Sequence, residues 1–292
     1  MLRSMTGYGR GEGRAGGHRI TVEIKSLNHR FLDLNIRLPR FYLALEEKMR
    51  EKVKSRINRG RIEVIVNIDQ ENGKKQPLTV DMDLAIAYYN ALKELAQRLN
   101  LPADMGAKDL LGLPEVVKTS EPEWTEEGLW PGIEAALEEA LIQLLTMRAR
   151  EGARLEEELR ERAEKVRSLI KAIEERAHQV PGEYAEKLRQ RIRELAGDLV
   201  LDPSRLEMEV ALFAERADIR EEVVRLHSHL DQFLRALDQG GAVGKQLDFL
   251  LQEMGREAHT ISAKANDLMI SNWVISLRGE MEKMREQVQN VE

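Results

Sequence analysis

Two rows of acids, cations and a histidine recur at intervals of three or four residues in the last third of the chain. The first row is Asp218, Glu222, Arg225 and His229. The second row is Glu253, Glu257, Thr260 and Lys264. Carboxylates and imidazole ligate divalent cations, whereas arginine and lysine counter the charge of phosphate. If both rows face one side of the molecule, they predict a site that binds an anionic ligand through a metal ion.

Each row lies one residue ahead of an apolar seam with the spacing of packed helices. The first seam is Ile219, Val223, Leu226, Leu230, Phe233 and Leu237. The second seam is Val243, Leu247, Leu250, Met254, Ala258, Ile261, Ala265 and Leu268, with one four-residue stutter. Gly240-Gly241 supplies a tight reversal between them. The stretch from residue 205 to the C-terminus is therefore predicted to form two long antiparallel helices.

The reversal also predicts which residues lie level with each other. Two antiparallel helices are related by an approximate two-fold axis, so both polar rows face the same side. Folding the chain between residues 240 and 241 places Arg225 level with Arg256. It places His229 level with Glu253, and Asp218 level with Lys264. The competing interpretation is that these polar residues are solvated helix faces or partner-selecting ion pairs.

Composition sets the limits for the rest of the chain. Its 292 residues suffice for two domains, and it has no cysteine, which excludes disulfides and thiol chemistry. No apolar run approaches a membrane span, so we expect a cytoplasmic protein without a membrane partner. The net charge of −6 is uneven, because residues 1–70 hold 15 Lys and Arg against 8 Asp and Glu. A basic front region is compatible with a nucleic-acid partner.

The front of the chain predicts an α+β unit with a small β-sheet. Glycine-dotted residues 2–14 and the alternating run 18–38 predict a β-hairpin, with 18–38 as one long or bulged strand. Residues 43–57 predict an amphipathic helix, and 61–69 a third strand. The basic residues near the turn between them could contact phosphates or could form a solvated face. They include Arg56, Arg59 and Arg61.

The middle of the chain is predicted to be mainly helical. Asp81 is a candidate N-cap for a helix to about residue 99, and prolines and glycines make 101–130 irregular. A long helix then runs from 131 to 177, and we expect it to reach away from the front domain to a bundle or another subunit. Pro181-Gly182 ends it, a helix follows at 184–195, and Asp202 is a candidate N-cap. The predicted domains are 1–130, 131–204 and 205–292, the last carrying the site.

Several motifs in a fixed order resemble the YicC/YloC family of bacterial proteins from end to end. The N-terminal motifs are Arg3-Ser4-Met5-Thr6-Gly7-Tyr8-Gly9, Glu23-x-x-Ser26-x-Asn28-x-Arg30-Phe31-Leu32-Asp33, Arg37-x-Pro39 and Arg59-Gly60-Arg61. The later motifs are Arg148-x-x-Glu151-Gly152, Arg216-x-Asp218-Ile219-x-Glu221-Glu222, Leu247-Asp248-Phe249-Leu250-x-Gln252-Glu253-Met254-x-Arg256-Glu257 and Arg285-Glu286-Gln287-x-Gln289-Asn290-x-Glu292. Long motifs in one order make an accidental match far less common than a single short pattern does.

The resemblance implies divalent-metal-dependent endoribonucleases that act on single-stranded RNA, with a link to small-RNA turnover, built as ring-like hexamers. It makes the polar rows the leading site candidate. The family signature covers Asp218, Glu222, Arg225, His229, Asp248, Glu253, Arg256 and Glu257. The chain departs from the usual Asn-Thr-Leu-x-Ser-Lys-Ser at 259–265, where two hydroxyls are replaced by Ala263 and Ala265.

Two routes of RNA cleavage fit these residues. In the first, a Mn²⁺ or Mg²⁺ ion polarises the phosphoryl group and activates water. The catalytic and metal-binding candidates are Glu253, Glu257 and His229, with Glu222 or Asp218 as further ligands. The RNA-binding candidates are Arg225, Arg256, Lys264, Arg216, Arg3, Arg30, Arg56, Arg59 and Arg61. In the second route, His229 acts as general base on the 2′-hydroxyl and a cyclic phosphate forms.

Two functions of other classes remain open from the sequence. The first is an RNA-binding adaptor that presents RNA to a separate nuclease, which predicts unchanged cleavage when the site residues are replaced. The second is a purely structural oligomer, which predicts no salt-dependent affinity for RNA.

Overall fold

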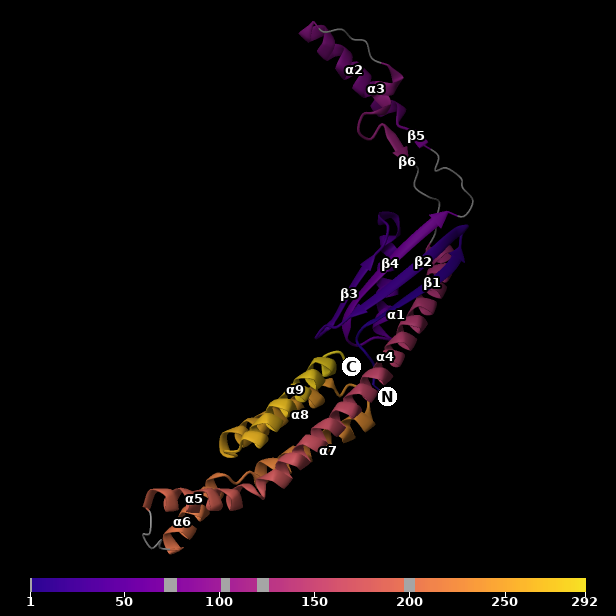
Figure 1. Ribbon diagram of the computed structural model, residues 1–292. Helices are drawn as coiled ribbons and strands as arrows, with labels where there is room; N and C mark the ends of the chain where they lie inside the picture. Colours follow the sequence, from indigo (N-terminus) through magenta and orange to yellow (C-terminus); the bar gives the residue numbers. More distant parts are fainter. Residues whose placement is uncertain (1, 71–77, 101–105, 120–125, 197–202) are drawn as a thin grey trace.

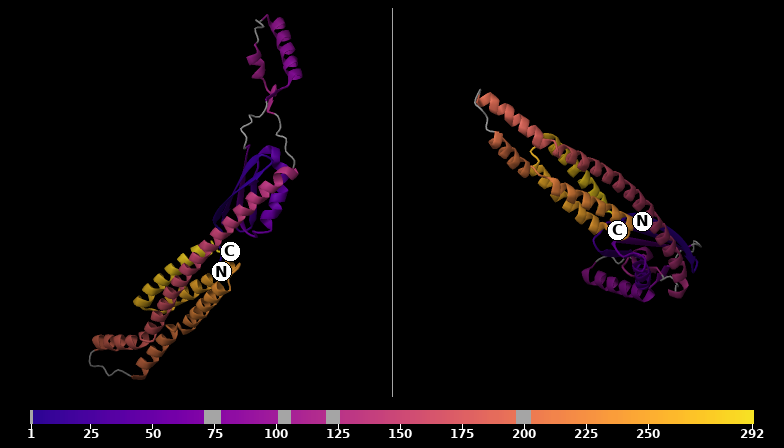
Figure 2. Two further views of the ribbon diagram at one scale, coloured as in Figure 1. Left: turned by 90° about the vertical axis from the view of Figure 1, so that its right-hand side faces the viewer. Right: turned by 90° about the horizontal axis from the view of Figure 1, so that it is seen from below.

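The computed structural model describes residues 2–70, 78–100, 106–119, 126–196 and 203–292. Figures 1 and 2 show an elongated chain, with a small lobe at one end, a β-sheet in the middle and helices at the other end. One helix, α4 (Glu126–Ala177), runs from the sheet into the helical end. The fold is α+β, as the sequence predicts.

The central sheet has the order β1-β2-β4-β3, with strands Gly7–Ala15, His18–Leu27, Gly60–Gln70 and Leu32–Arg37 respectively. Neighbours are antiparallel except β3 and β4, which are parallel. The predicted hairpin and the strand at 61–69 are confirmed. The prediction of one strand over 18–38 is wrong, because the chain leaves the sheet after β2 and re-enters it as β3 on the far side of β4.

The alternation of apolar and polar side chains along β2 and β4 explains how the sheet buries one face. Ile20, Val22 and Ile24 of β2 are fully buried, and so are Ile62 and Val64 of β4. A 3₁₀-helix, η1 (Arg40–Leu45), and helix α1 (Glu46–Lys54) follow β3 and add their apolar side chains to the same core. The helix predicted at 43–57 is therefore present, although its regular α-helical part is shorter.

The glycines of β1 allow α4 to lie directly on the strand. A Cβ atom on Gly9 would stand 2.0 Å from the carbonyl oxygen of Ala140, and one on Gly11 would stand 2.0 Å from that of Ala136. The glycine-dotted strand is thus a packing surface. The expectation that the long helix reaches away from the front domain is wrong for its first half, which covers β1 and β2. Its second half packs against α7 and α9, described below.

The small lobe comprises β5 (Leu78–Val80), helix α2 (Met82–Leu99), helix α3 (Ala107–Leu111) and β6 (Val117–Thr119), with β5 and β6 antiparallel. The predicted N-cap is confirmed, because an Asp81 side-chain oxygen accepts a hydrogen bond from the Leu84 amide at 3.1 Å. The region predicted to be irregular contains α3, β6 and the start of α4, which begins five residues before Pro131.

The helical end contains α5 (Val180–Ala196), α6 (Pro203–Arg216), α7 (Arg220–Gln239), α8 (Gly244–Lys264) and α9 (Leu268–Val288). Pro181 lies in the first turn of α5, where a missing amide hydrogen costs little. The candidate cap Asp202 lies outside the described residues. α7 and α8 form the predicted hairpin, with Gly240 and Gly241 at positive φ between them.

The prediction of only two helices after residue 205 is wrong, because the structure has four. The second predicted helix ends at Lys264, and Asp267 caps α9 by accepting a hydrogen bond from the Ile270 amide at 2.9 Å. Leu268, expected in the seam, is 77% exposed. The remaining seam residues are buried.

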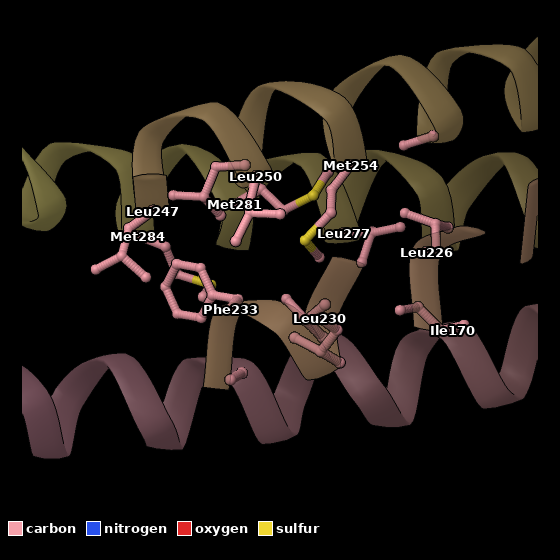
Figure 3. Close-up of a cluster of buried hydrophobic side chains, with 14 of the residues drawn as sticks. Ile170, Leu226, Leu230, Phe233, Leu247, Leu250, Met254, Leu277, Met281 and Met284 are labelled. Carbon is pink, nitrogen blue, oxygen red and sulfur yellow. The ribbon is translucent and has the colours of Figure 1, made fainter. Parts of the chain in front are cut away.

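The seams of α7 and α8 form one core with α4 and α9. Figure 3 shows Phe233 and Leu230 of α7 facing Leu247 and Met254 of α8, with Met281 of α9 beside them. Because α4 belongs to this core and to the core under the sheet, it fixes the sheet relative to the hairpin. The domain limits expected at 130 and 204 stay predictions.

Candidate active site

Two buried carboxylates lie on the polar face of the α7–α8 hairpin. Glu222 on α7 and Glu257 on α8 are the only buried acids among the residues whose burial the structure describes. Lys264 donates a hydrogen bond from Nζ to Oε1 of Glu222 at 2.6 Å. Arg225 donates to Oε1 of Glu257 at 3.4 Å and also pairs with Glu221. Each buried acid thus has a cation from the opposite helix, as expected if both polar rows face one side.

The acids and cations of this cluster lie at different depths. The Glu222 side chain is 8% exposed, whereas that of its partner Lys264 is 40% exposed. Arg225 is likewise much more exposed than Glu257. The Oε2 atom of Glu222 is buried and has no hydrogen-bond partner within the described part of the chain. An anion approaching this face therefore meets the cations first and the carboxylates beneath them.

Electrostatics link the cluster to the beginning of α7. The hydrogen bond that Lys264 donates to Glu222, together with the nearby charges of Glu221 and Asp218, raises the pKa of Lys264 above its ordinary value. Asp218 itself pairs with Arg220 at 2.6 Å, and this hydrogen bonding lowers the pKa of Asp218 to about 2. We name these residues the acid–cation cluster: Asp218, Glu221, Glu222, Arg225, Glu257 and Lys264.

Two predicted catalytic residues lie outside this cluster. Glu253 pairs with Arg256 of its own helix at 2.6 Å. His229 is partly exposed, and its Nδ1 atom is buried without a hydrogen-bond partner among the described residues. The structure gives no hydrogen bond or ion pair between His229 and Glu253 in the part of the chain that it describes. The predicted five-residue metal set is therefore not joined into one network.

The donor set determines which kind of metal site fits. No group of three or more His, Asp or Glu side chains within the described ranges is placed to hold a metal ion. The described residues therefore do not form a complete metal-binding site by themselves. Mg²⁺ commonly binds through only one or two carboxylates, with water and substrate phosphates as its other ligands. The unpartnered Oε2 of Glu222 and the buried carboxylate of Glu257 supply the oxygen ligands which that second arrangement needs.

The six basic residues predicted to bind RNA outside the α7–α8 hairpin fall into three groups. Arg56 pairs with Glu138 of α4 at 2.5 Å, and Arg61 lies 3.7 Å from Asp33, so both charges are partly countered. Arg30 and Arg59 line a cavity at the junction between the sheet and α8. The remaining N-terminal and α6 candidates are exposed: Arg3 and Arg216.

Sequence reasoning missed a buried arginine that joins the two ends of the chain. Arg148 of α4 donates from Nε to the carbonyl oxygen of Ser4 at 2.5 Å and forms an ion pair with Glu292. Ser4 also forms an isolated antiparallel β-bridge with Val291. Burial lowers the pKa of Arg148, and Glu292 opposes that effect. Arg148 and Glu292 belong to two separate motifs of the family resemblance, and no spacing rule connects residues that are so far apart in sequence.

The fold and the cluster define a class of protein: an α+β chain in which a helical hairpin presents paired buried acids and cations on one face. The family described as endoribonuclease YicC-like, N-terminal region, matches residues 2–157, and its C-terminal counterpart matches residues 173–292. The chain therefore belongs to the YicC-like endoribonuclease family, as the motifs indicated. No helix within the described ranges is long and apolar enough to cross a membrane.

Two relatives match over the full length of this chain and of their own. A protein of Clostridioides difficile (strain 630) named probable endoribonuclease YicC is 39% identical over 293 residues. A protein of Haemophilus influenzae with the same name is 31% identical over 292 residues.

Proposed function

We propose that this protein is an endoribonuclease that cleaves single-stranded RNA at the acid–cation cluster. The observation that carries the proposal is the pairing of Glu222 with Lys264 and of Glu257 with Arg225 across the hairpin. Buried acids beneath exposed cations suit a phosphodiester substrate, because the cations can transfer from carboxylate to phosphate oxygens. The relatives' names, probable endoribonuclease, support internal cleavage of RNA.

We assign the role of each residue from how deeply its side chain is buried. Arg225 and Lys264 bind the scissile phosphate and counter the charge that develops on it during cleavage. When they turn toward phosphate, Glu222 and Glu257 lose their partners and become free to hold a proton or a cation. The free Oε2 of Glu222 makes it the first candidate for that role. Glu253 and His229, which lie further along the hairpin, remain candidates for positioning the RNA strand.

We further propose that the reaction depends on Mn²⁺ or Mg²⁺, held by Glu222 and Glu257. Such an ion, when bound, polarises the phosphoryl oxygen and lowers the pKa of its water. Hard oxygen ligands favour these ions over zinc, which prefers histidine and cysteine. A role in small-RNA turnover, a cytoplasmic location and a ring-like hexamer stay predictions that rest on the family resemblance.

The chemistry of the product ends tests the proposal and its rival route. We would incubate end-labelled single-stranded RNA with the wild type in Mn²⁺, in Mg²⁺ and in excess chelator. Metal-dependent hydrolysis predicts cleavage that chelator abolishes and products without cyclic phosphate. Cyclic phosphate ends that persist in chelator would instead favour His229 as general base on the 2′-hydroxyl. Absence of cleavage by protein that still binds RNA would contradict the proposal and favour the adaptor.

A further inference from the structure

A groove between α8 and α9 carries arginines that the acid–cation cluster does not use. The two helices lie side by side in Figures 1 and 2. An open cavity of about 590 Å³ lies between their outer surfaces, and Arg256, Arg278 and Arg285 line it. Arg278 is exposed and has no ion-pair partner among the residues that the structure describes. One acid, Glu282, lies among them.

A second basic cavity lies where the sheet meets the beginning of α8. It has a volume of about 370 Å³, and Arg30, Arg59 and Lys245 line it. The Nε atom of Arg59 is buried without a hydrogen-bond partner in the described part of the chain. α8 begins here without a side-chain cap, so its first amides and the positive end of its dipole add to the attraction for anions.

The two cavities are consecutive parts of one surface. Asp248 lines the second cavity and Arg285 lines the first, and the two side chains are joined at 3.1 Å. On α8, Lys245, Asp248 and Gln252 are separated by three and four residues, so they share one helix face that continues to His259. At 1.5 Å per residue, that face extends for about 21 Å.

The same groove opens toward the acid–cation cluster. Thr260 lines the first cavity and also belongs to the polar row that contains Glu257 and Lys264. Arg256 lines this cavity as well and, one residue before Glu257, lies on the outer side of α8 between the groove and the cluster. A strand that followed the groove would therefore leave it beside the buried acids.

We propose that this surface is a binding track for the sugar–phosphate backbone of single-stranded RNA, which leads the strand from the sheet junction to the cluster. The track consists of Arg30, Arg59, Lys245, Arg256, Arg278 and Arg285. Its six cations outnumber the acids that lie among them or pair with them, Asp248, Glu253 and Glu282, so it carries a surplus of positive charge. The inference rests on the proposed function, since it names the path by which that substrate reaches the site.

Salt dependence of RNA binding tests the track. We would measure the anisotropy of a fluorescent single-stranded RNA with the wild type, Lys245→Gln, Arg278→Gln and the double variant. Lys245 and Arg278 are exposed and make no ion pair within the described ranges, so their replacement leaves the fold intact. Each lost phosphate contact lowers the slope of log K against log salt by about 0.7. We expect a loss of about 1.4 in the double variant. Arg193→Gln, at an exposed position of α5 without an ion pair within the described ranges, is the matched control and keeps the wild-type slope.

The outcomes separate this inference from the proposed function. If the wild type binds and cleaves RNA but the double variant keeps its slope, the track is refuted and the active site stands. A loss in Arg193→Gln as large as in either single variant would also refute it, because the effect would then reflect total charge. If the wild type neither binds nor cleaves RNA, the proposed function falls and the track falls with it.

Discussion

Replacing Arg148 tests how the two ends of the chain hold the sheet and the hairpin together. Its side chain is 1% exposed, whereas Glu292 is 18% exposed and can reach water when left alone. Arg148→Met keeps the apolar stem but removes a charge-assisted hydrogen bond, which contributes about 1.5–3 kcal/mol. It also leaves the buried carbonyl of Ser4 without this donor, at a cost of about 1–3 kcal/mol. Because the methionine stem retains the packing, we expect the free energy of unfolding to fall by about 3 kcal/mol.

Hydrogen exchange measures this loss of stability at the backbone amides that join the two ends of the chain. The Ser4 amide donates to the Arg148 carbonyl, and the Met5 amide donates to the Asn290 carbonyl. A loss of about 3 kcal/mol speeds exchange at both amides by about a hundredfold, since 1.4 kcal/mol corresponds to a factor of ten. Arg150→Met, at an exposed position of the same helix, is the control and should change stability by no more than about 0.5 kcal/mol. Equal exchange rates in the two variants would refute the reasoning.

Two further predictions concern packing and charge. Gly11→Ala places a Cβ 2.0 Å from the Ala136 carbonyl and should lower the free energy of unfolding by about 1–3 kcal/mol or more, measured by urea denaturation. Gly279→Ala, in open space on α9, should be stabilising, and similar losses in both would contradict the close packing of β1 and α4. Asp218 should titrate near pH 2 by NMR, so its stabilising effect is present above its ordinary pKa of 3.8 and is lost as pH falls toward 2. Arg220→Gln should raise that pKa toward 3.8; an unchanged titration would show that the ion pair does not form.

The periodicity of apolar residues predicted the hairpin because the residues in each seam must face a partner helix. It could not show that the second helix stops at Lys264, since Leu268 continues the same spacing. The second helix ends there because the Asp267 side chain caps the start of a new helix, α9. Periodicity also could not distinguish one strand over 18–38 from two, because both halves alternate and only tertiary pairing with β4 separates them.

The candidate site was predictable in composition but not in its contacts. Folding the chain about its two glycines placed Arg225 level with Arg256, yet Arg225 contacts Glu257. The same folding placed Lys264 level with Asp218, yet its hydrogen bond goes to Glu222 one turn further along α7. The length of the side chains and the exact path of the reversal set these partners. Neither is visible in the spacing of residue types.

The most direct test of the central claim is the single-turnover cleavage of end-labelled single-stranded RNA by Glu222→Gln, measured together with its affinity for that RNA. Glutamine keeps the shape of the side chain but removes its charge. We predict that cleavage slows by about a hundredfold or more while binding persists. Glu161→Gln, at an exposed position of α4, should cleave like the wild type. Wild-type cleavage by Glu222→Gln would contradict the assignment of the acid–cation cluster as the active site.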